Sequence, residues 1–124
     1  NVASSAGFLP GPLLSTYYAT KNYVVRLSEA IYEELRETGS AVTISCLCPG
    51  PVDTEFNQVA GAKFSIKSLT SAQVAKQAVE QTLAGKLLIV PGAAVRLGVF
   101  ASRFAPNKPL LRIVRGIQER KGER

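Results

Sequence analysis

Tyr17 and Lys21 lie four residues apart, and their side chains are of types that can exchange protons. In a helix, residues with this spacing share a face and lie one turn apart. A free phenol ionises near pH 10, so it is a poor proton donor or acceptor at neutral pH. A neighbouring ammonium favours the phenolate, which suits Tyr17 to acid–base chemistry. The alternative is coincidence, because such a pair arises by chance in roughly one chain in four of this composition.

Ser4 is a second candidate, in the stretch Asn1–Gly7 that precedes Tyr17. Residues 1–4 read as the end of a buried strand, and ligands of open α/β sheets bind beyond the carboxyl ends of strands. A hydroxyl at that point can hydrogen-bond a substrate carbonyl oxygen. The alternative is a loop serine that bonds the local backbone, the commoner role of a serine before Ala-Gly. Ser5 competes for the same catalytic role.

A proline-glycine bend forms the third candidate, Cys48-Pro49-Gly50-Pro51-Val52-Asp53-Thr54, directly after an apolar run. Glycine lets a flat ring approach the backbone closely, because no Cβ intervenes. The alternative is a tight turn that only ends the strand.

The order of Ser4, Tyr17-x-x-x-Lys21 and strand-Pro49-Gly50-x-Val52-x-Thr54 resembles the short-chain dehydrogenase/reductase family over most of residues 1–92. The resemblance implies that Ser4, rather than Ser5, acts with Tyr17 and Lys21 in catalysis. It also implies a bound NAD or NADP, with Tyr17 near it and Lys21 on its ribose. The nicotinamide would lie at the turn of Pro49 and Gly50. Val52 would bond its amide, and Thr54 the amide or a phosphate.

The same resemblance implies the C-terminal half of a Rossmann-like, doubly wound parallel α/β sheet. The expected activity is that of a carbonyl reductase or alcohol dehydrogenase, on a hydrophobic, acyl or steroid-like carbonyl. A homodimer or homotetramer is expected. No Gly-x-Gly-x-x-Gly loop occurs in the sequence, and the family carries its glycine-rich turn earlier in the chain. We therefore expect a fragment that is inactive alone. The alternative is an inactive fragment or a scaffold whose basic tail contacts a membrane or another subunit.

The first helix is expected from a cap at Ser15 or Thr16 to about Thr38, before Gly39. Its apolar residues recur at three- and four-residue steps and predict a buried stripe that continues back to Tyr17 and Lys21. That stripe consists of Val24, Leu27, Ile31 and Leu35. The loop before the helix carries Phe8, Leu9, Leu13 and Leu14, which either line a substrate pocket or pack on the helix.

The order of a strand at residues 1–4, the first helix and a strand at 41–47 implies a right-handed parallel crossover. Ala41–Leu47 is an apolar run typical of a strand buried on both faces, and Lys86–Val90 reads as another strand. Thr70 and Gln73 form a capping box for a helix to about Ala84, with Gly85 at its end. Its expected inward residues are Val74, Ala75, Ala78, Val79 and Leu83. Residues 55–69 lack a clear period and are expected to form a mobile segment over the site.

The charge of the chain is concentrated in residues 93–124, which contain eight basic and two acidic residues, whereas residues 1–92 contain seven of each. We therefore predict a catalytic part, 1–92, and a basic tail, 93–124, with amphipathic helices near 94–104 and 109–118. Leu110, Ile113, Val114 and Ile117 should share one face of the second. The tail can contact an anionic membrane, cover a pocket or contact another subunit.

Other functions are disfavoured by composition. The chain has no histidine, and Cys46 and Cys48 lack metal-ligand spacing, so no metal site is expected. Buried thiols are typical of a reducing compartment, which favours a cytoplasmic protein that is membrane-peripheral if its tail binds lipid. No aromatic-rich basic motif supports binding of nucleic acid.

Overall fold

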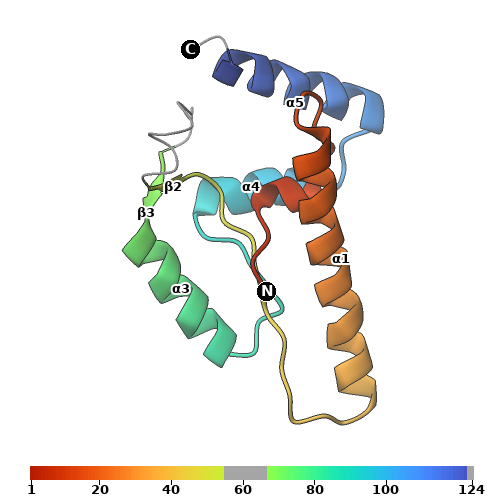
Figure 1. The fold of residues 1–124 in the computed structure, drawn as a ribbon, viewed down its shortest axis with the longest axis vertical. Helices are drawn as coiled ribbons and strands as arrows, with labels where there is room; N and C mark the ends of the chain where they lie inside the picture. The colour runs from red at the N-terminus through yellow and green to blue at the C-terminus, as the bar shows by residue number, and fades with distance from the viewer. Residues whose placement is uncertain (55–66, 123–124) are drawn as a thin grey trace.

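The structure, a computed structural model, describes residues 1–54 and 67–122. The elements follow in the order η1 (Ser5–Phe8), α1 (Ser15–Glu37), β1 (Cys46–Leu47), β2 (Val52–Asp53), β3 (Leu69–Thr70), α3 (Ser71–Leu83), β4 (Leu88–Ile89), α4 (Ala93–Ser102) and α5 (Asn107–Gly122). Figure 1 shows α1 and α3 on opposite sides of the molecule, with β2 and β3 near the start of α3. Most of the segment 55–69 that was expected to cover the site lies outside the described residues.

Three parallel segments form the main sheet. Val2 bridges Leu47 in parallel, and β1 pairs in parallel with β4, so that Cys46 lies opposite Leu88. Cys48 N donates to Ile89 O over 2.7 Å at the end of this ladder. The predicted parallel arrangement of strand, helix and strand is therefore confirmed. β2 and β3 form a second parallel pair, which the sequence did not predict.

The two predicted strands are shorter than expected. Only Cys46–Leu47 of the expected 41–47 and Leu88–Ile89 of the expected 86–90 are strand. Val42 is 64% exposed, so burial on both faces was wrong for this part of the run. The physical reason is the ladder itself, because the described hydrogen bonds between this run and residues 1–3 and 87–89 involve Ser45 to Cys48 and none of residues 41–44.

The long helix α1 has the predicted end but a different start. Its C-cap is Thr38, and Gly39 has φ +65°, the left-handed conformation that glycine adopts after a helix. At the start, Leu14 is the N-cap and no side chain caps the helix, so the cap predicted at Ser15 or Thr16 was wrong. Both lie at the exposed start of the helix, where water can satisfy its free N–H groups.

The buried face of α1 is also rotated from the predicted stripe. The buried residues are Tyr18, Val25 and Ser28, whereas Leu27 is 39% exposed and Val24, Ile31 and Leu35 are half-buried. The rotation follows from packing against Ala3, Cys46 and Cys48, which form one core cluster with Val25. The pattern of apolar residues gave the helix but misplaced its inner face.

Helix α3 starts as predicted. Thr70 Oγ1 accepts from Gln73 N over 3.2 Å, and Gln73 Oε1 accepts from Thr70 N over 3.0 Å, which completes the capping box. Gly85 follows the end of the helix with φ +74°. Too many residues of α3 were predicted to face inward. Val74 is buried, whereas Val79 and Leu83 are 60% and 83% exposed, because the strands that α3 contacts are only two residues long.

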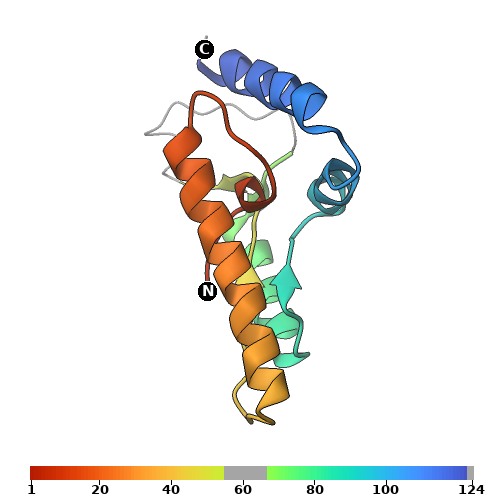
Figure 2. The same ribbon diagram turned by 90° about the vertical axis from the view of Figure 1, so that its right-hand side faces the viewer.

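The tail forms the two predicted helices, and α5 lies across the start of α1 (Figures 1 and 2). Val114 is buried against Ala6 and Tyr18, with Leu9 and Leu110 packed around them. The predicted apolar face is thus buried in part, since Ile113 and Ile117 are 58% and 44% exposed. Within residues 1–54 and 67–122, no helix combines the length and the apolar character that crossing a membrane requires.

Candidate active site

The loop before α1, the first half of α1 and the proline-glycine bend meet at one place, which we call the junction (residues 3–9, 17–25 and 48–50). Ser5 N donates to Pro49 O over 2.9 Å, and Ala3 N donates to Leu47 O over 2.8 Å. These backbone bonds fix the serine loop against the bend. Ser4 and Pro49, which lie far apart in the sequence, are thereby brought together.

Ser4 occupies the N-cap of η1 with an extended backbone, φ −167°. Its Oγ accepts from Ala6 N over 3.1 Å. The local backbone bond, the alternative role considered for this serine, is thus present. A hydroxyl that accepts one hydrogen bond can still donate its proton, so Ser4 keeps the capacity to bind a carbonyl oxygen. Ser5 lies inside η1, and its backbone N–H is already bonded to Pro49.

Tyr17 and Lys21 lie side by side on α1, as their spacing predicted. Lys21 Nζ is 5.6 Å from the centroid of the Tyr17 ring, within the range of a cation–π contact. The expectation that both are covered was wrong for Tyr17, which is 45% exposed, while Lys21 is half-buried. The loop 9–14 packs on Tyr18 instead. Gly11 is so close that a Cβ built on it would lie 2.0 Å from Tyr18 Cδ2.

Tyr18 is the buried neighbour of Tyr17, and it is anchored to the tail. Its hydroxyl oxygen accepts from Gln118 Nε2 of α5 over 2.5 Å. Burial raises the pKa of the Tyr18 phenol, an effect that the Gln118 hydrogen bond partly offsets and the nearby Tyr17 reinforces. The two rings meet edge to face with centroids 6.0 Å apart. Tyr18 is thus held as a neutral structural residue, and Tyr17 is the tyrosine open to a ligand.

Asn22 is a positioning residue that the sequence analysis missed. Its Nδ2 donates to the carbonyl oxygens of Ala6, Leu9 and Tyr18 over 3.2, 3.0 and 2.8 Å. These bonds tie η1 and the loop after it to the helix that bears Tyr17 and Lys21. A signal was present, because asparagine is an unfavourable residue inside a helix unless its side chain has a specific partner.

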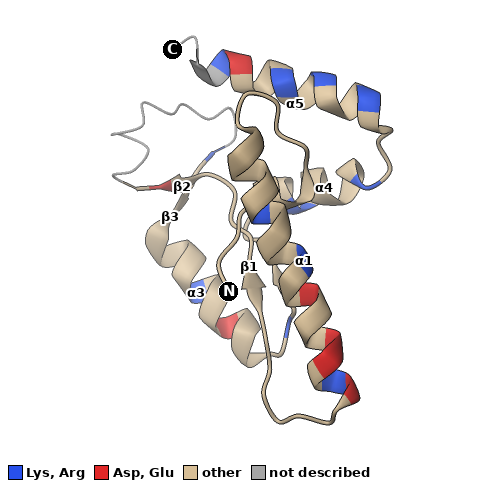
Figure 3. Cartoon of the chain, turned by 45° about the vertical axis from the view of Figure 1, so that its right-hand side comes forward, with Lys and Arg blue, Asp and Glu red and all other residues tan. Residues whose placement is uncertain are grey.

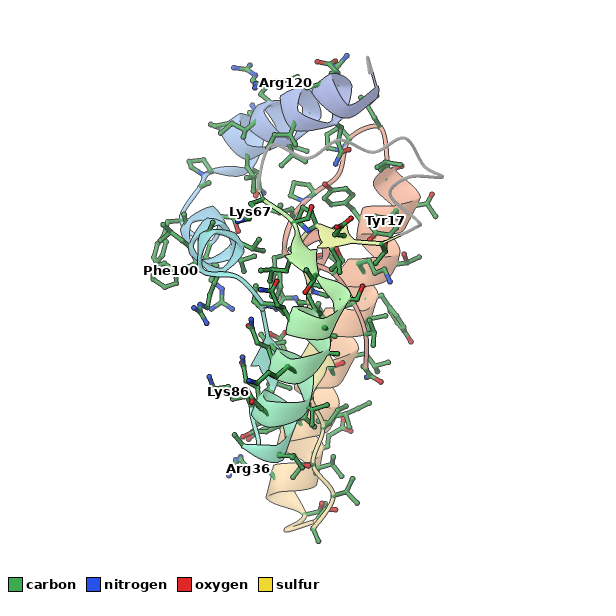
Figure 4. All side chains as sticks on the ribbon, turned by 90° about the vertical axis from the view of Figure 1, so that its left-hand side faces the viewer. Tyr17, Arg36, Lys67, Lys86, Phe100 and Arg120 are labelled. Carbon is green, nitrogen blue, oxygen red and sulfur yellow. The ribbon has the colours of Figure 1, made fainter. Side chains whose placement is uncertain are left out.

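The bend lines a cavity of about 390 Å³. Gly50, Pro51 and Val52 form one wall, and Lys67–Leu69, Gln73–Val74 and Pro91–Val95 form the others. Val52 belongs to β2 and lies opposite Leu69, and Thr54 is half-buried two residues later. Figure 4 shows Tyr17 and Lys67 in the same half of the molecule, away from Arg36 and Lys86.

Small-molecule sites commonly have this size, and the lining here combines apolar residues with Lys67, Ser68 and Gln73. Gly50 and Val52 of the predicted cofactor set line it, whereas Pro49 and Thr54 adjoin it in the sequence. Gly50 and Val52 thus lie at the edge of this cavity, whereas Ser4, Tyr17 and Lys21 do not line it. Among the described residues, no hydrogen bond joins Ser4 to Tyr17 or Lys21.

Cys46 and Cys48, the second of which belongs to the junction, are free, fully buried thiols. Cys48 Sγ contacts Cys46 O at 3.6 Å and Cys46 Sγ at 3.8 Å. Burial, followed by the neighbouring Cys46, raises the pKa of the Cys48 thiol to about 12. Within the described part of the chain, no three His, Cys, Asp or Glu side chains are grouped to hold a metal ion.

A family model described as short chain dehydrogenase matches residues 1–65. The bovine dehydrogenase/reductase SDR family member 11 is 40% identical over 58 residues, which are 45% of this chain and 23% of the relative. The human very-long-chain 3-oxoacyl-CoA reductase is 37% identical over 59 residues, or 48% of this chain and 18% of the relative. The matched segments thus span less than a quarter of these relatives.

Solved structures agree with these matches. A short-chain dehydrogenase/reductase from Burkholderia phymatum, in complex with NAD, is 26% identical with a TM-score of 0.67, over 80% of this chain and 44% of that one. A short-chain dehydrogenase from Sphingobium yanoikuyae, in complex with NADPH, is 25% identical with a TM-score of 0.63, over 83% and 41%. The predicted Rossmann-like α/β fold class is therefore confirmed, and this chain spans less than half of these neighbours.

Proposed function

The chain belongs to the short-chain dehydrogenase/reductase family, and on that premise we propose that the protein is an NAD(P)-dependent oxidoreductase. When bound, the cofactor supplies or accepts the hydride. The proposed substrate is a carbonyl compound or the corresponding alcohol. We propose that the activity belongs to a longer protein that includes this chain. The reason is that the chain covers only 44% and 41% of the two solved neighbours.

In the proposed mechanism, Tyr17 exchanges the proton of the substrate oxygen. During reduction the phenol gives its proton to the carbonyl oxygen, and during oxidation the phenolate takes it back. Lys21, whose Nζ lies 5.6 Å from the centroid of the Tyr17 ring, would bind the cofactor ribose. Ser4 would donate its hydroxyl proton to the same substrate oxygen and hold it in place.

The contact between Lys21 and the exposed ring of Tyr17 is the observation that carries this proposal. A buried phenol such as Tyr18 is closed to substrate, whereas Tyr17 is open to it and has a cation beside it. The cavity at Gly50 and Val52 supports the cofactor assignment, and we propose Pro49 and Thr54 as its neighbours in the same site. Either NAD or NADP fits, as the two solved neighbours named above carry NAD and NADPH.

A hydrophobic carbonyl substrate is proposed from two observations. Leu13 and Leu14, directly before α1, are 64% and 48% exposed. The similarity to a reductase named for very-long-chain 3-oxoacyl-CoA favours an acyl substrate over a steroid-like one. We also propose a homo-oligomer that covers α1, because Tyr23 and Leu27 on this helix are 67% and 39% exposed.

The test is the substitution Tyr17→Phe in the complete protein, with Tyr23→Phe as the matched control on the same helix. Loss of a general acid lowers turnover by about 10²–10⁴-fold, so Y17F should lose kcat by that factor and keep its fold. Y23F should retain full turnover. Activity of Y17F close to the wild-type level would refute the role of Tyr17.

The alternative, an inactive piece or a scaffold, makes a different prediction for cofactor binding. Without a glycine-rich phosphate loop, residues 1–124 alone should bind NADPH too weakly to quench its fluorescence, whereas the complete protein should bind it. Failure of the complete protein to bind either cofactor would favour the scaffold.

A further inference from the structure

Helix α4 exposes an apolar ridge, formed by Leu97 and Phe100 of the helix and Phe104 just after it. These side chains are 68%, 58% and 74% exposed. The two phenylalanine rings meet edge to face with centroids 5.3 Å apart. The opposite side of the helix, with Val95, Val99 and Ser102, faces the body and is half-buried. Figure 4 shows Phe100 on the outer side of α4, directed away from the body.

Beside the ridge lies a second cavity, of about 240 Å³, between β4, the end of α3 and α4. Lys86, Arg96 and Arg103 contribute the cations of its wall. Its apolar lining consists of Phe8, Leu88, Val90, Val99 and Phe100. Phe100 therefore belongs to both the ridge and the cavity, so that a cationic pocket and an exposed aromatic side chain are continuous.

Most of the charge of this region is uncompensated, although Arg115 is paired with Glu119 over 2.8 Å. Residues 93–118 contain five basic residues and no acidic one. Among the described residues, Lys86, Arg96 and Arg103 take part in no ion pair. Figure 3 shows this contrast, with basic residues along α4 and α5 and acidic ones toward the far end of α1. A partner for the region must therefore be both anionic and able to accept apolar side chains.

We propose that the ridge and the adjoining cationic cavity bind the surface of an anionic phospholipid membrane. Lys86, Arg96 and Arg103 contact lipid phosphates, and Phe100, Phe104 and Leu97 enter the boundary between headgroups and acyl chains. Basic side chains are attracted to anionic lipid headgroups, and aromatic side chains beside them can enter the boundary with the acyl chains. The proposal is independent of the oxidoreductase activity.

A second copy of the chain fits the ridge less well. In a two-fold symmetric contact, Arg96 and Arg103 would face the same patch of the partner, which offers no carboxylate on α4 to neutralise them. A stable protein interface also needs about 20–30 residues a side, whereas the ridge presents three side chains. Charge and size therefore favour a lipid surface over self-association.

The experiment is co-sedimentation of the complete protein with vesicles of phosphatidylcholine alone and of phosphatidylcholine mixed with phosphatidylserine. We expect binding to the mixed vesicles that weakens as salt is raised, and little binding to phosphatidylcholine. The double substitution Arg96→Gln/Arg103→Gln should weaken binding about 30-fold, given the usual contribution of a basic residue near an anionic surface. Phe100→Ser/Phe104→Ser should weaken it by a factor of about 100, as two partly buried apolar rings are lost.

Two matched controls come from α3. Lys76→Gln removes an exposed cation, and Leu83→Ser removes an apolar side chain that is 83% exposed. Both should bind mixed vesicles like the wild type. Equal binding to the two vesicle types, or unchanged binding by either double variant, would overturn the proposal. So would a double phenylalanine variant that loses self-association in ultracentrifugation but keeps its vesicle binding.

A site-specific probe gives a second measurement. An environment-sensitive fluorophore at Phe104→Cys should shift to shorter wavelength with mixed vesicles, because the probe enters a less polar layer. Cys46 and Cys48 are fully buried and should stay unlabelled. The same probe at Leu83→Cys should not shift. An unshifted spectrum at position 104 would contradict insertion of the ridge.

Discussion

The junction and the ridge are both surface regions, but their exposed aromatic residues are held in different ways. Tyr17 at the junction lies next to Tyr18, which is buried and bonded to Gln118, and next to Lys21. Asn22 of the same helix bonds the backbone of η1. Within residues 1–54 and 67–122, Phe100 and Phe104 of the ridge make a ring contact only with each other. A reacting phenol needs a fixed position, whereas side chains that enter a lipid layer do not. The difference in anchoring matches the difference in proposed roles.

The largest effect on stability is expected at high pH, from Cys48 of the junction. Its folded-state pKa is raised to about 12, above that of an unfolded thiol. Stability is therefore complete below about pH 8.5 and is lost as the pH rises toward 12, by up to about 1.4 kcal/mol per pH unit. Denaturant unfolding across this range measures the slope. Cys48→Ala should reduce the dependence of the unfolding free energy on pH. An unchanged dependence in that variant would show that other groups cause the loss of stability.

Asn22→Ala tests how firmly the junction is anchored. The change removes three hydrogen bonds and leaves buried carbonyl groups of the loop without this donor. We expect a loss of about 2–3 kcal/mol in the free energy of unfolding. Glu34→Ala, at an exposed position of the same helix, should change it by less than about 0.5 kcal/mol. Equal stability of the two variants would show that Asn22 does not hold the loop.

Tyr18→Phe tests whether Tyr18 stabilises the fold while its neighbour Tyr17 carries out catalysis. Loss of the hydroxyl bonded to Gln118 should cost about 1 kcal/mol of unfolding free energy. Turnover of the complete protein should remain, in contrast to Y17F, which should stay stable and lose turnover. A Y18F variant that is stable but inactive would contradict this assignment, because it would make Tyr18 the catalytic tyrosine.

The smallest effect is expected in the ridge. Phe100→Ser should alter the free energy of unfolding by less than about 0.5 kcal/mol when no vesicles are present, because this side chain is more than half exposed. Thermal or denaturant unfolding checks this value. A loss of several kcal/mol would mean that the ridge packs inside the folded protein, and the contrast with the junction would disappear.

Local signals in the sequence predicted local structure well. The capping box of Thr70 and Gln73, the left-handed Gly39 and the adjacent side chains of Tyr17 and Lys21 each depend on residues at most four positions apart. Their geometry is fixed by the helix itself. The family was also recognisable, because its motifs occur in a fixed order along the chain.

Features that depend on distant residues were not predictable in this way. The bond between Tyr18 and Gln118 joins residues 100 positions apart, and it decides which of two adjacent tyrosines is buried. The length of β1 depends on where residues 1–3 and 87–89 reach it. The apolar residues Val79 and Leu83 were assigned inward by periodicity, but two-residue strands offer too little surface to cover them. The catalytic and cofactor roles of the site residues stay predictions.

Gly50 is the point where the two regions touch. A Cβ at this position would lie 2.6 Å from Val95 Cγ2, on the inner side of α4. Closely packed interiors transmit small displacements instead of absorbing them. The turn at Gly50 and the inner side of α4 therefore pack as one unit, and any side chain at position 50 would displace either the turn or the helix.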